Sequence, residues 1–269
     1  MTDDTIARRI VREVAPQHTD IIFEIGPGMG ALTRLLLAKP AGYVVAIELD
    51  PRMIDKLRRD IRTDNFHLIE ADALKADWAD VLAEAIAKWR QLALASVNQT
   101  PRCRVVANLP YYISTPIMER LMQQGKRIFD MTLMLQREVV ERIISPPGSK
   151  EYGYLSVLVQ YHCQVEKLFD VPPTAFTPAP KVHSSIIRLE PFINPFRIDD
   201  SGQFFKLVGA AFAQRRKTIL NNLKAAATVL RFNQSPETAL QQAGIDPKRR
   251  AETLSIEDFS RLYSLLFSN

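Results

Sequence analysis

The 269-residue sequence contains only two cysteines and four histidines. Cys103 and Cys163 both lie in apolar segments, so we expect them to be reduced core residues of a cytosolic protein, where disulfides are rare. The histidines show no spacing that would complete a zinc site with these thiols, and no metal is expected.

Long apolar runs are missing too. No segment approaches the roughly 20 apolar residues that a helix needs to cross a bilayer. Charged residues are scattered through residues 1–20, which excludes a secretory signal there. Low-complexity tracts and evident internal repeats are also lacking, so we expect a globular protein of the cytoplasm with no membrane partner.

What the sequence does contain is an ordinary globular composition with a basic excess. Hydrophobic residues make up 46% and charged residues 24%, the formal net charge is +5, and the isoelectric point is near 9.2. A basic chain favours a polyanionic partner, although many soluble proteins are mildly basic without one. The length allows one large domain, or a domain of about 200 residues with a small appendage.

Apolar runs and helical periods alternate along most of the chain. Alternation over five units predicts an α/β fold with a doubly wound parallel sheet. Beyond a linker at 191–200, residues 204–230 and 237–267 carry helical periods only, so the predicted domains are 1–190 and an all-helical domain at 201–269. Strands are expected at 21–25, 43–47, 66–70, 103–107, 129–135, 165–169 and 182–189, and helices at 3–15, 31–39, 78–89, 115–124, 137–144 and 154–161, with another beginning at 51.

Three successive strand ends carry polar chemistry. Gly26, Gly28 and Gly30 follow the first strand and allow a tight turn and a close approach of the backbone to a ligand. Glu48 ends the second strand, where a carboxylate can accept both hydroxyls of a ribose. Asp72 follows the third strand and can accept a hydrogen bond from the amine of an adenine. Because the carboxyl ends of parallel strands share one edge of the sheet, this set predicts a site for an adenine nucleoside.

Two cofactor classes fit such a site. A nicotinamide dinucleotide pairs a glycine-rich turn with an acidic residue about 20 positions later. Here the spacing is G-x-G-x-G, and Pro27 cannot donate the backbone N–H that a phosphate cradle uses. S-adenosylmethionine has no phosphate, and hydride transfer has no use for Asp72, the carboxylate that follows the third strand. The ordered set therefore favours S-adenosylmethionine, although each residue taken singly is more often a turn glycine or a solvated strand-end carboxylate.

The segment 108–115 follows the fourth strand and suits a flat ring that bears an amine. Asn108 offers a side-chain carbonyl, and Leu109 offers a backbone carbonyl whose angle is restricted by Pro110. Tyr111 offers a ring face for stacking. An isolated Asn-x-Pro is more often only a strand-ending turn, so the context decides.

The ordered motifs resemble those of the KsgA-type small-subunit ribosomal RNA adenine dimethyltransferases, and the resemblance covers nearly the whole chain. Its specificity comes from the number of motifs in the same order. They are E-I-G-P-G at 24–28, E-L-D at 48–50, D-A at 72–73, N-L-P-Y-Y at 108–112, Q-R-E-V at 136–139, F-T-P-A-P-K-V at 176–182, F-A-Q-R-R-K-T at 212–218 and G-I-D-P at 244–247.

This resemblance implies a Rossmann-like class I S-adenosylmethionine-dependent methyltransferase sheet with a small helical C-terminal domain. The implied reaction transfers methyl groups from S-adenosylmethionine to N6 of two adjacent adenosines, in a hairpin loop near the 3′ end of 16S rRNA, during small-subunit maturation. A monomer acting on the small ribosomal subunit or its precursor is expected.

The resemblance also implies roles for individual residues. The catalytic segment is Asn108, Leu109, Pro110 and Tyr111, with Tyr112 as an alternative stacking ring. Charge runs are more often solvated faces than binding sites, yet the family pattern favours an RNA-facing patch at Arg215, Arg216 and Lys217, expected mid-helix, with Arg8, Arg9 and Arg12 as companions. The implied cofactor-binding residues are Gly26, Gly28, Glu48, Asp72, Ala73 and Asn108.

The sequence departs from the family pattern at its start. Family members carry a basic segment with a Gln-Asn-Phe-Leu element before the first helix, whereas this sequence begins at that helix. Either the sequence is truncated or the site is more open, and weak binding of S-adenosylmethionine is expected. Two rivals remain, a non-catalytic ribosome-assembly factor and a large-subunit rRNA methylase of the macrolide-resistance type. Residues 176–182 and the C-terminal motifs favour the small-subunit type.

Overall fold

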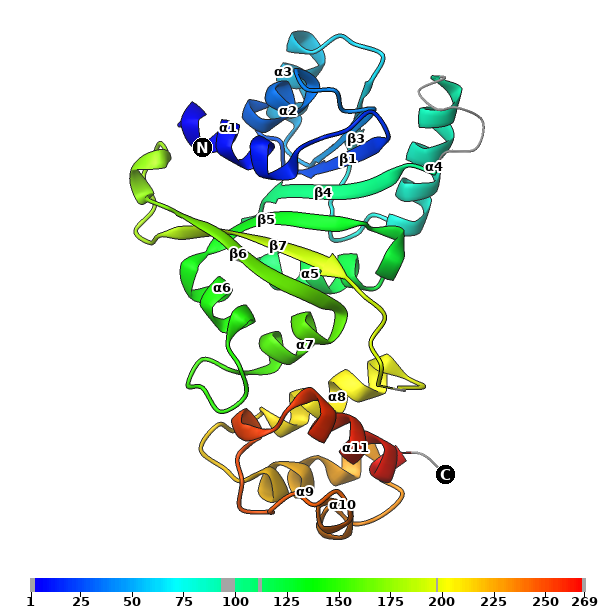
Figure 1. The fold of residues 1–269 in the computed structure, drawn as a ribbon, viewed down its shortest axis with the longest axis vertical. Coiled ribbons are helices and arrows are strands. Elements are labelled where there is room, and N and C mark those ends of the chain that lie inside the picture. The colour runs from blue at the N-terminus through cyan, green and yellow to red at the C-terminus, as the bar shows by residue number, and fades with distance from the viewer. Residues whose placement is uncertain (1–2, 93–99, 111–112, 197, 268–269) are drawn as a thin grey trace. The chain divides into compact units, whose positions relative to one another are not determined.

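The computed structural model describes residues 3–92, 100–110, 113–196 and 198–267. In this part of the chain, seven strands form one sheet with the order β3-β2-β1-β4-β5-β7-β6 (Figure 1). The strand order changes direction between β1 and β4, and ligands of such sheets bind beyond the carboxyl ends at this point. The strands are β1 Asp20–Ile25, β2 Tyr43–Glu48, β3 Phe66–Glu70, β4 Arg102–Asn108, β5 Asp130–Gln136, β6 Cys163–Val171 and β7 Ser184–Pro191.

The expectation of a wholly parallel sheet is wrong for β7. Strands β1 to β5 pair in parallel, but β7 runs antiparallel to both β5 and β6. Residues 172–183 between β6 and β7 contain only the short 3-10 helix Pro173–Ala175, which cannot carry the chain back across the sheet. The two strands therefore pair antiparallel through this irregular connection, because a parallel pair usually needs an α-helix in its crossover.

Helices bury both faces of this sheet (Figure 1). On one face, Ile10 of α1 and Leu36 of α2 pack with Ile22 of β1. The next residue, Phe23, points to the other face and meets Trp78 of α4 edge to face, with ring centroids 6.4 Å apart. Burial on both sides explains why β1 reads as a continuous apolar run. The helices here are α1 Asp4–Val14, α2 Ala31–Leu37, α3 Pro51–Asp60, α4 Trp78–Gln91, α5 Ser114–Met122 and α6 Arg137–Ile144.

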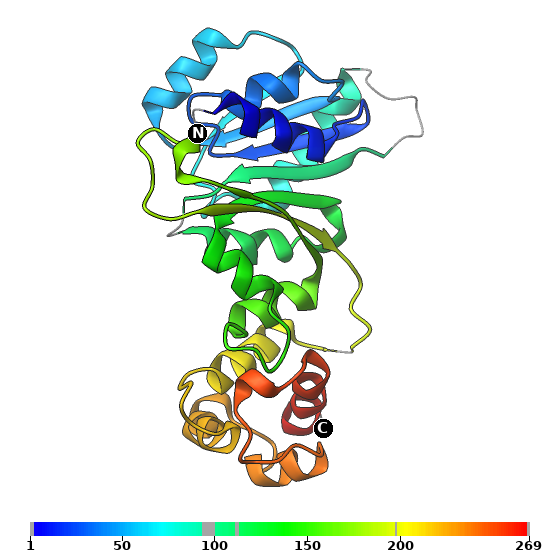
Figure 2. The same ribbon diagram turned by 60° about the vertical axis from the view of Figure 1, so that its left-hand side comes forward.

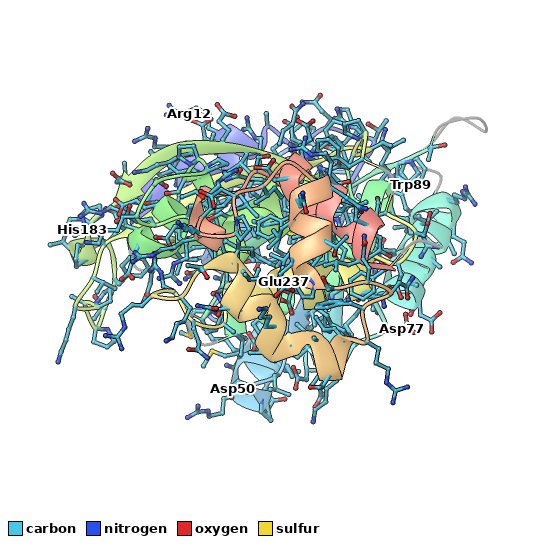
Figure 3. All side chains as sticks on the ribbon, turned by 90° about the horizontal axis from the view of Figure 1, so that it is seen from below. Arg12, Asp50, Asp77, Trp89, His183 and Glu237 are labelled. Carbon is cyan, nitrogen blue, oxygen red and sulfur yellow. The ribbon has the colours of Figure 1, made fainter. Side chains whose placement is uncertain are left out.

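Aspartates begin three of these helices. The Asp3 side chain accepts the N–H of Thr5 at 2.8 Å at the start of α1. Asp50 and Asp77, both labelled in Figure 3, cap α3 and α4 in the same way. Each cap satisfies a backbone donor that the first helical turn leaves unpaired. Pro51 at the first position of α3 agrees with the expected helix start.

Packing divides the chain into two compact units, residues 1–140 with 163–192, and residues 141–162 with 193–269. The second unit is helical (Figure 2). Its core includes Tyr161 of α7, whose ring lies 5.1 Å from that of Phe204 of α8. The domains expected from the sequence, 1–190 and 201–269, group residues 141–162 with the sheet, whereas packing groups them with the helical unit. The limits of the two domains stay a prediction. The helices of the second unit are α7 Tyr154–His162, α8 Ser201–Ala211, α9 Ile219–Leu230, α10 Pro236–Gln242 and α11 Ile256–Phe267.

The cysteines agree with the sequence-based expectation, because Cys103 and Cys163 are both free and buried. Burial raises the pKa of the Cys103 thiol to about 11 and that of Cys163 to about 12. Both side chains are therefore protonated packing residues at neutral pH. Within the described ranges, every helix is too short or too polar to cross a membrane.

Candidate functional site

A cavity of about 340 Å³ lies at the carboxyl ends of β1, β2 and β3, beside the loop that follows β4. Its volume falls in the range of about 300–1,000 Å³ that is usual for small-molecule sites. Two larger hollows, of about 760 and 810 Å³, lie elsewhere on the first unit and share no lining residue with it. The lining of the small cavity includes Gly26, Glu48, Leu49, Asp72, Ala73, Pro110 and Ile113.

The glycine turn after β1 shapes the first wall of this cavity. Gly26 has φ +67° and donates its N–H to the Ile47 carbonyl at 2.9 Å. Gly28 has φ +55° and donates its N–H to Oε2 of Glu48 at 3.0 Å. Both values lie in the left-handed region that favours glycine. A Cβ at Gly26 would meet no atom within 4 Å, so the ligand side of the turn is open.

Glu48, the last residue of β2, is held by three backbone donors. In addition to the Gly28 bond, its Oε1 accepts the N–H groups of Leu49 at 2.8 Å and Asp50 at 2.9 Å. Hydrogen bonds to an ionised carboxylate are shorter and stronger than neutral ones. The carboxylate is thereby fixed at the cavity wall, and its oxygens keep lone pairs for further donors such as ribose hydroxyls.

Asp72 and Ala73 form the next wall, in the loop after β3. Oδ1 of Asp72 accepts the N–H of Leu74 at 2.9 Å, and its backbone carbonyl accepts the N–H of Lys75 at 2.8 Å. The Ala71 N–H donates to the Glu48 carbonyl at 3.0 Å, which joins this loop to the end of β2. The second and third strand ends therefore face one cavity, as the sequence predicts.

The Asn108 segment closes the cavity from the β4 side. Asn108 ends β4 and is half-buried, while Leu109 is buried and donates its N–H to the Met134 carbonyl at 3.3 Å. Pro110 and Ile113 line the cavity, and the Pro110 carbonyl accepts the Ile113 N–H at 3.1 Å. Gly28, Asn108 and Leu109 adjoin these lining residues without lining the cavity themselves. Tyr111 and Tyr112 lie outside the described residues.

Two residues in or beside this cavity belong to motifs of the sequence but had no predicted role. Glu24 of β1 is only 2% exposed, and burial, with a contribution from the charge of Glu48, raises its pKa from 4.5 to about 7. Its signal was an acidic residue inside an apolar strand run. Leu49 is 62% exposed and lines the cavity. The sequence feature that could have identified Leu49 is its position directly after Glu48, the carboxylate at the end of a strand.

The basic run Arg215 to Lys217 lies in the loop between α8 and α9, so the expected mid-helix position is wrong. The Thr218 side chain caps the start of α9 by accepting the Asn221 N–H at 3.3 Å. Because an N-cap residue has non-helical backbone angles, the basic residues just before it lie outside α9. All three basic residues are exposed. The Ile219 N–H donates to the Arg249 carbonyl at 2.7 Å, which brings this loop beside a second basic run at 248–250.

Comparisons with known proteins agree with one another. The profile of the family described as ribosomal RNA adenine dimethylase matches residues 1–267. The chain is 41% identical over 264 residues to the ribosomal RNA small subunit methyltransferase A of Clostridium acetobutylicum, covering 97% of this chain and 89% of the relative. It is 44% identical over 266 residues to the protein of the same name from Chromohalobacter salexigens, covering 97% and 86%.

Solved structures share the fold. A dimethyladenosine transferase from Plasmodium falciparum superimposes with a TM-score of 0.73 at 26% identity, covering 96% of this chain and 94% of that one. The 23S rRNA methyltransferase ErmE superimposes with a TM-score of 0.62 at 23% identity, covering 98% of both chains. The second likeness concerns the fold alone. The Rossmann-like methyltransferase sheet with a C-terminal helical region is thereby confirmed.

Proposed function

The chain belongs to the ribosomal RNA adenine dimethylase family, and from this premise we propose that it dimethylates N6 of two adjacent adenosines near the 3′ end of 16S rRNA. Family membership makes it an S-adenosylmethionine-dependent methyltransferase that acts on adenine in ribosomal RNA. One structural observation supports the proposal most strongly. Gly26, Glu48, Asp72 and Pro110, from four different strand ends, line one cavity.

The cavity fits S-adenosylmethionine, because the carboxylates of Glu48 and Asp72 and the open glycine turn suit a nucleoside that carries no phosphate. When bound, the cofactor supplies an electrophilic methyl group on a sulfonium. Glu48 would accept the ribose hydroxyls, since its carboxylate is already oriented by three N–H donors. Asp72 would accept the adenine amine with Ala73 alongside, and the backbone at Gly26 and Gly28 would lie against the methionine part.

The Asn108 segment would hold the target adenine. We propose that Oδ1 of Asn108 and the Leu109 carbonyl accept the N6 hydrogens of that base. This contact raises the electron density on N6, a weak nucleophile whose lone pair is delocalised into the ring. The Leu109 N–H donates to the Met134 carbonyl and Pro110 follows, so the backbone that carries the Leu109 carbonyl is restrained. Tyr111 would stack on the base, a contact worth about 1–3 kcal/mol.

Docking of the RNA is assigned to basic loops of the second unit. Arg215, Arg216 and Lys217 are exposed and adjoin the run at 248–250 through the Ile219 to Arg249 hydrogen bond. Both basic runs, 215–217 and 248–250, lie in loops, although the sequence predicted a helix for the first. Two adjacent loops can present their cations to one stretch of phosphates. We propose that the partner is 16S rRNA in the small ribosomal subunit or its precursor, and that the protein acts in the cytoplasm as a monomer.

The deciding experiment is methyl transfer to small ribosomal subunits that lack adenine dimethylation. The protein is incubated with S-adenosylmethionine labelled in its methyl group, and the modified nucleotides are mapped by primer extension. We expect two adjacent dimethyladenosines near the 3′ end of 16S rRNA. Large ribosomal subunits serve as the control substrate. Methylation of large subunits alone would identify the protein as a large-subunit rRNA methylase of the macrolide-resistance type instead. Binding of small subunits without any transfer would identify a non-catalytic assembly factor.

A further inference from the structure

The groove between α1 and α2 is a strongly basic surface outside the candidate active site. It has a volume of about 760 Å³ and shares no lining residue with the cofactor cavity. Its basic residues are Arg8, Arg9, Arg12 and Lys39, and no acidic residue is among those that line it in the described part of the chain. The remaining lining is mostly apolar or neutral, including Val11 and Leu35.

Two of these cations have no partner within the described ranges. Arg12 and Lys39 are exposed and make neither an ion pair nor a side-chain hydrogen bond there. Arg8 and Arg12 lie four residues apart on one face of α1, so both side chains belong to the same groove. A groove that collects unpaired positive charge is complementary to a polyanion.

The other two cations are held in place at the groove. Nε of Arg8 lies 2.6 Å from Oδ2 of Asp4. The Arg9 guanidinium lies 3.8 Å above the ring of Phe169 in β6. A guanidinium stacked on a ring keeps its N–H edge free, which is the edge that binds phosphate oxygens in pairs. Arg9 is therefore both ordered and available to an anion.

The groove begins at the same edge of the sheet as the cofactor cavity. The Asp3 N–H donates to the Ala175 carbonyl at 3.2 Å, just after the end of β6. Strand β6 runs in the same direction as β5 because both are antiparallel to β7, so its end lies at the carboxyl edge. From there the groove follows α1 from Thr5 to Pro16. An RNA that presents a nucleotide at the cavity can continue along this helix.

We propose that the α1–α2 groove binds the phosphate backbone of ribosomal RNA beyond the nucleotides that are methylated. This inference rests on the proposed function and extends it with a second contact on the first unit. The groove holds a tract of RNA by charge and shape, without reading its bases, as phosphate contacts do. It therefore affects the affinity for large RNA substrates and leaves the reaction at the adenine unchanged.

The test compares two double variants with the same change in charge. Arg12→Gln/Lys39→Gln removes the two unpaired cations of the groove. Lys126→Gln/Arg127→Gln is the control, because both residues are exposed, belong to the first unit and do not line the groove. All four side chains are exposed, and surface substitutions change stability little, so thermal unfolding should be nearly unchanged in both. Equilibrium binding to small subunits lacking dimethylation, and to protein-free 16S rRNA, is measured between about 50 and 200 mM salt.

We expect the groove variant to bind both substrates about three- to tenfold more weakly than the wild type and to show a salt slope shallower by about 1–2. The control and the wild type should bind alike. Methylation of a short hairpin that carries only the target loop should be unaffected in the groove variant. Equal binding by the groove variant and the control overturns the inference. Weaker binding to subunits but not to protein-free rRNA also overturns it, and identifies a ribosomal protein as the partner.

The readout separates this inference from the proposed function. Binding is measured without methyl transfer, so an inactive wild type that still binds through the groove contradicts only the function. An active wild type whose affinity does not depend on Arg12 and Lys39 contradicts only the groove. A groove variant with a lowered melting temperature is replaced by Arg9→Gln, whose side chain lies on the surface over Phe169.

Discussion

The N–H of Gly28 donates a 3.0 Å hydrogen bond to Oε2 of Glu48 and so joins the turn after β1 to the end of β2. The same carboxylate accepts two further N–H groups through Oε1. One side chain therefore sets the relative position of two walls of the proposed cofactor cavity. Its own orientation does not depend on a ligand, which is what a preorganised site requires.

Replacing Glu48 by alanine should weaken the binding of S-adenosylmethionine by about 10- to 100-fold, because hydrogen bonds to a charged group contribute about 1.5–3 kcal/mol. Isothermal titration calorimetry measures this change. The matched control is Glu70→Ala, since Glu70 ends β3 directly opposite Glu48 in the sheet but does not line the cavity. Equal affinities of the two variants would remove Glu48 from the proposed site.

The stability of the protein should depend on the protonation of Glu24. Burial raises the pKa of this carboxyl to about 7 in the folded protein, from 4.5. Between these two pH values the folded state keeps a proton that the unfolded chain has lost, so native stability falls as the pH rises through this window. Above pH about 7 both states are ionised and the contribution is constant. The full loss is up to about 3 kcal/mol.

The Glu24→Gln variant tests this dependence because it keeps the size of the side chain and cannot ionise. We expect similar stability to the wild type near pH 5 and greater stability near pH 8, measured by urea unfolding. Glu70→Gln, at an exposed strand end, should show the wild-type profile at both pH values. If the Glu24 variant and the wild type keep a constant difference from pH 5 to 8, the buried carboxyl is not the titrating group.

Sequence patterns predicted the layout well where local rules decide it. Glycine turns, caps such as Asp50 and apolar strands mark most elements, and parallel topology then brings Glu48 and Asp72 to one edge. What the patterns missed depends on tertiary contacts. The burial of Glu24 follows from its central strand. Arg215 and its neighbours continue a helical period because arginine and lysine are good helix formers, whereas α8 already ends at Ala211 and the Thr218 cap begins α9.

Asn108→Ala should reduce methyl transfer by about 100- to 1,000-fold, the usual cost of one preorganised polar group that acts in the transition state. Affinity for S-adenosylmethionine should change far less, since Asn108 does not line the cavity. Single-turnover kinetics on undermethylated subunits gives the rate, and calorimetry gives the affinity. Asn108→Asp keeps an oxygen acceptor and should recover part of the activity. Near-normal turnover in the alanine variant would refute the role of this amide.

Arg104 stabilises the edge of the sheet opposite to the site. Its guanidinium contacts Asp130 at 2.5 and 2.7 Å, Asp20 at 3.3 Å and the Val14 carbonyl at 2.5 Å, and all three charged side chains are buried. Arg104→Ala leaves two buried carboxylates poorly paired, so unfolding should become easier by about 3–5 kcal/mol. Arg102→Ala is the control, because Arg102 also binds Asp20 but is 38% exposed.

The control should cost about 1 kcal/mol or less, as partly exposed ion pairs do. Urea unfolding of the two variants measures the difference. Because Asp20 and Asp130 begin β1 and β5, while the cavity lies at the opposite ends of the strands, the folded Arg104 variant should keep its affinity for S-adenosylmethionine. Equal destabilisation by the two substitutions would mean that water reaches these carboxylates, and a loss of affinity would mean that both edges of the sheet are coupled.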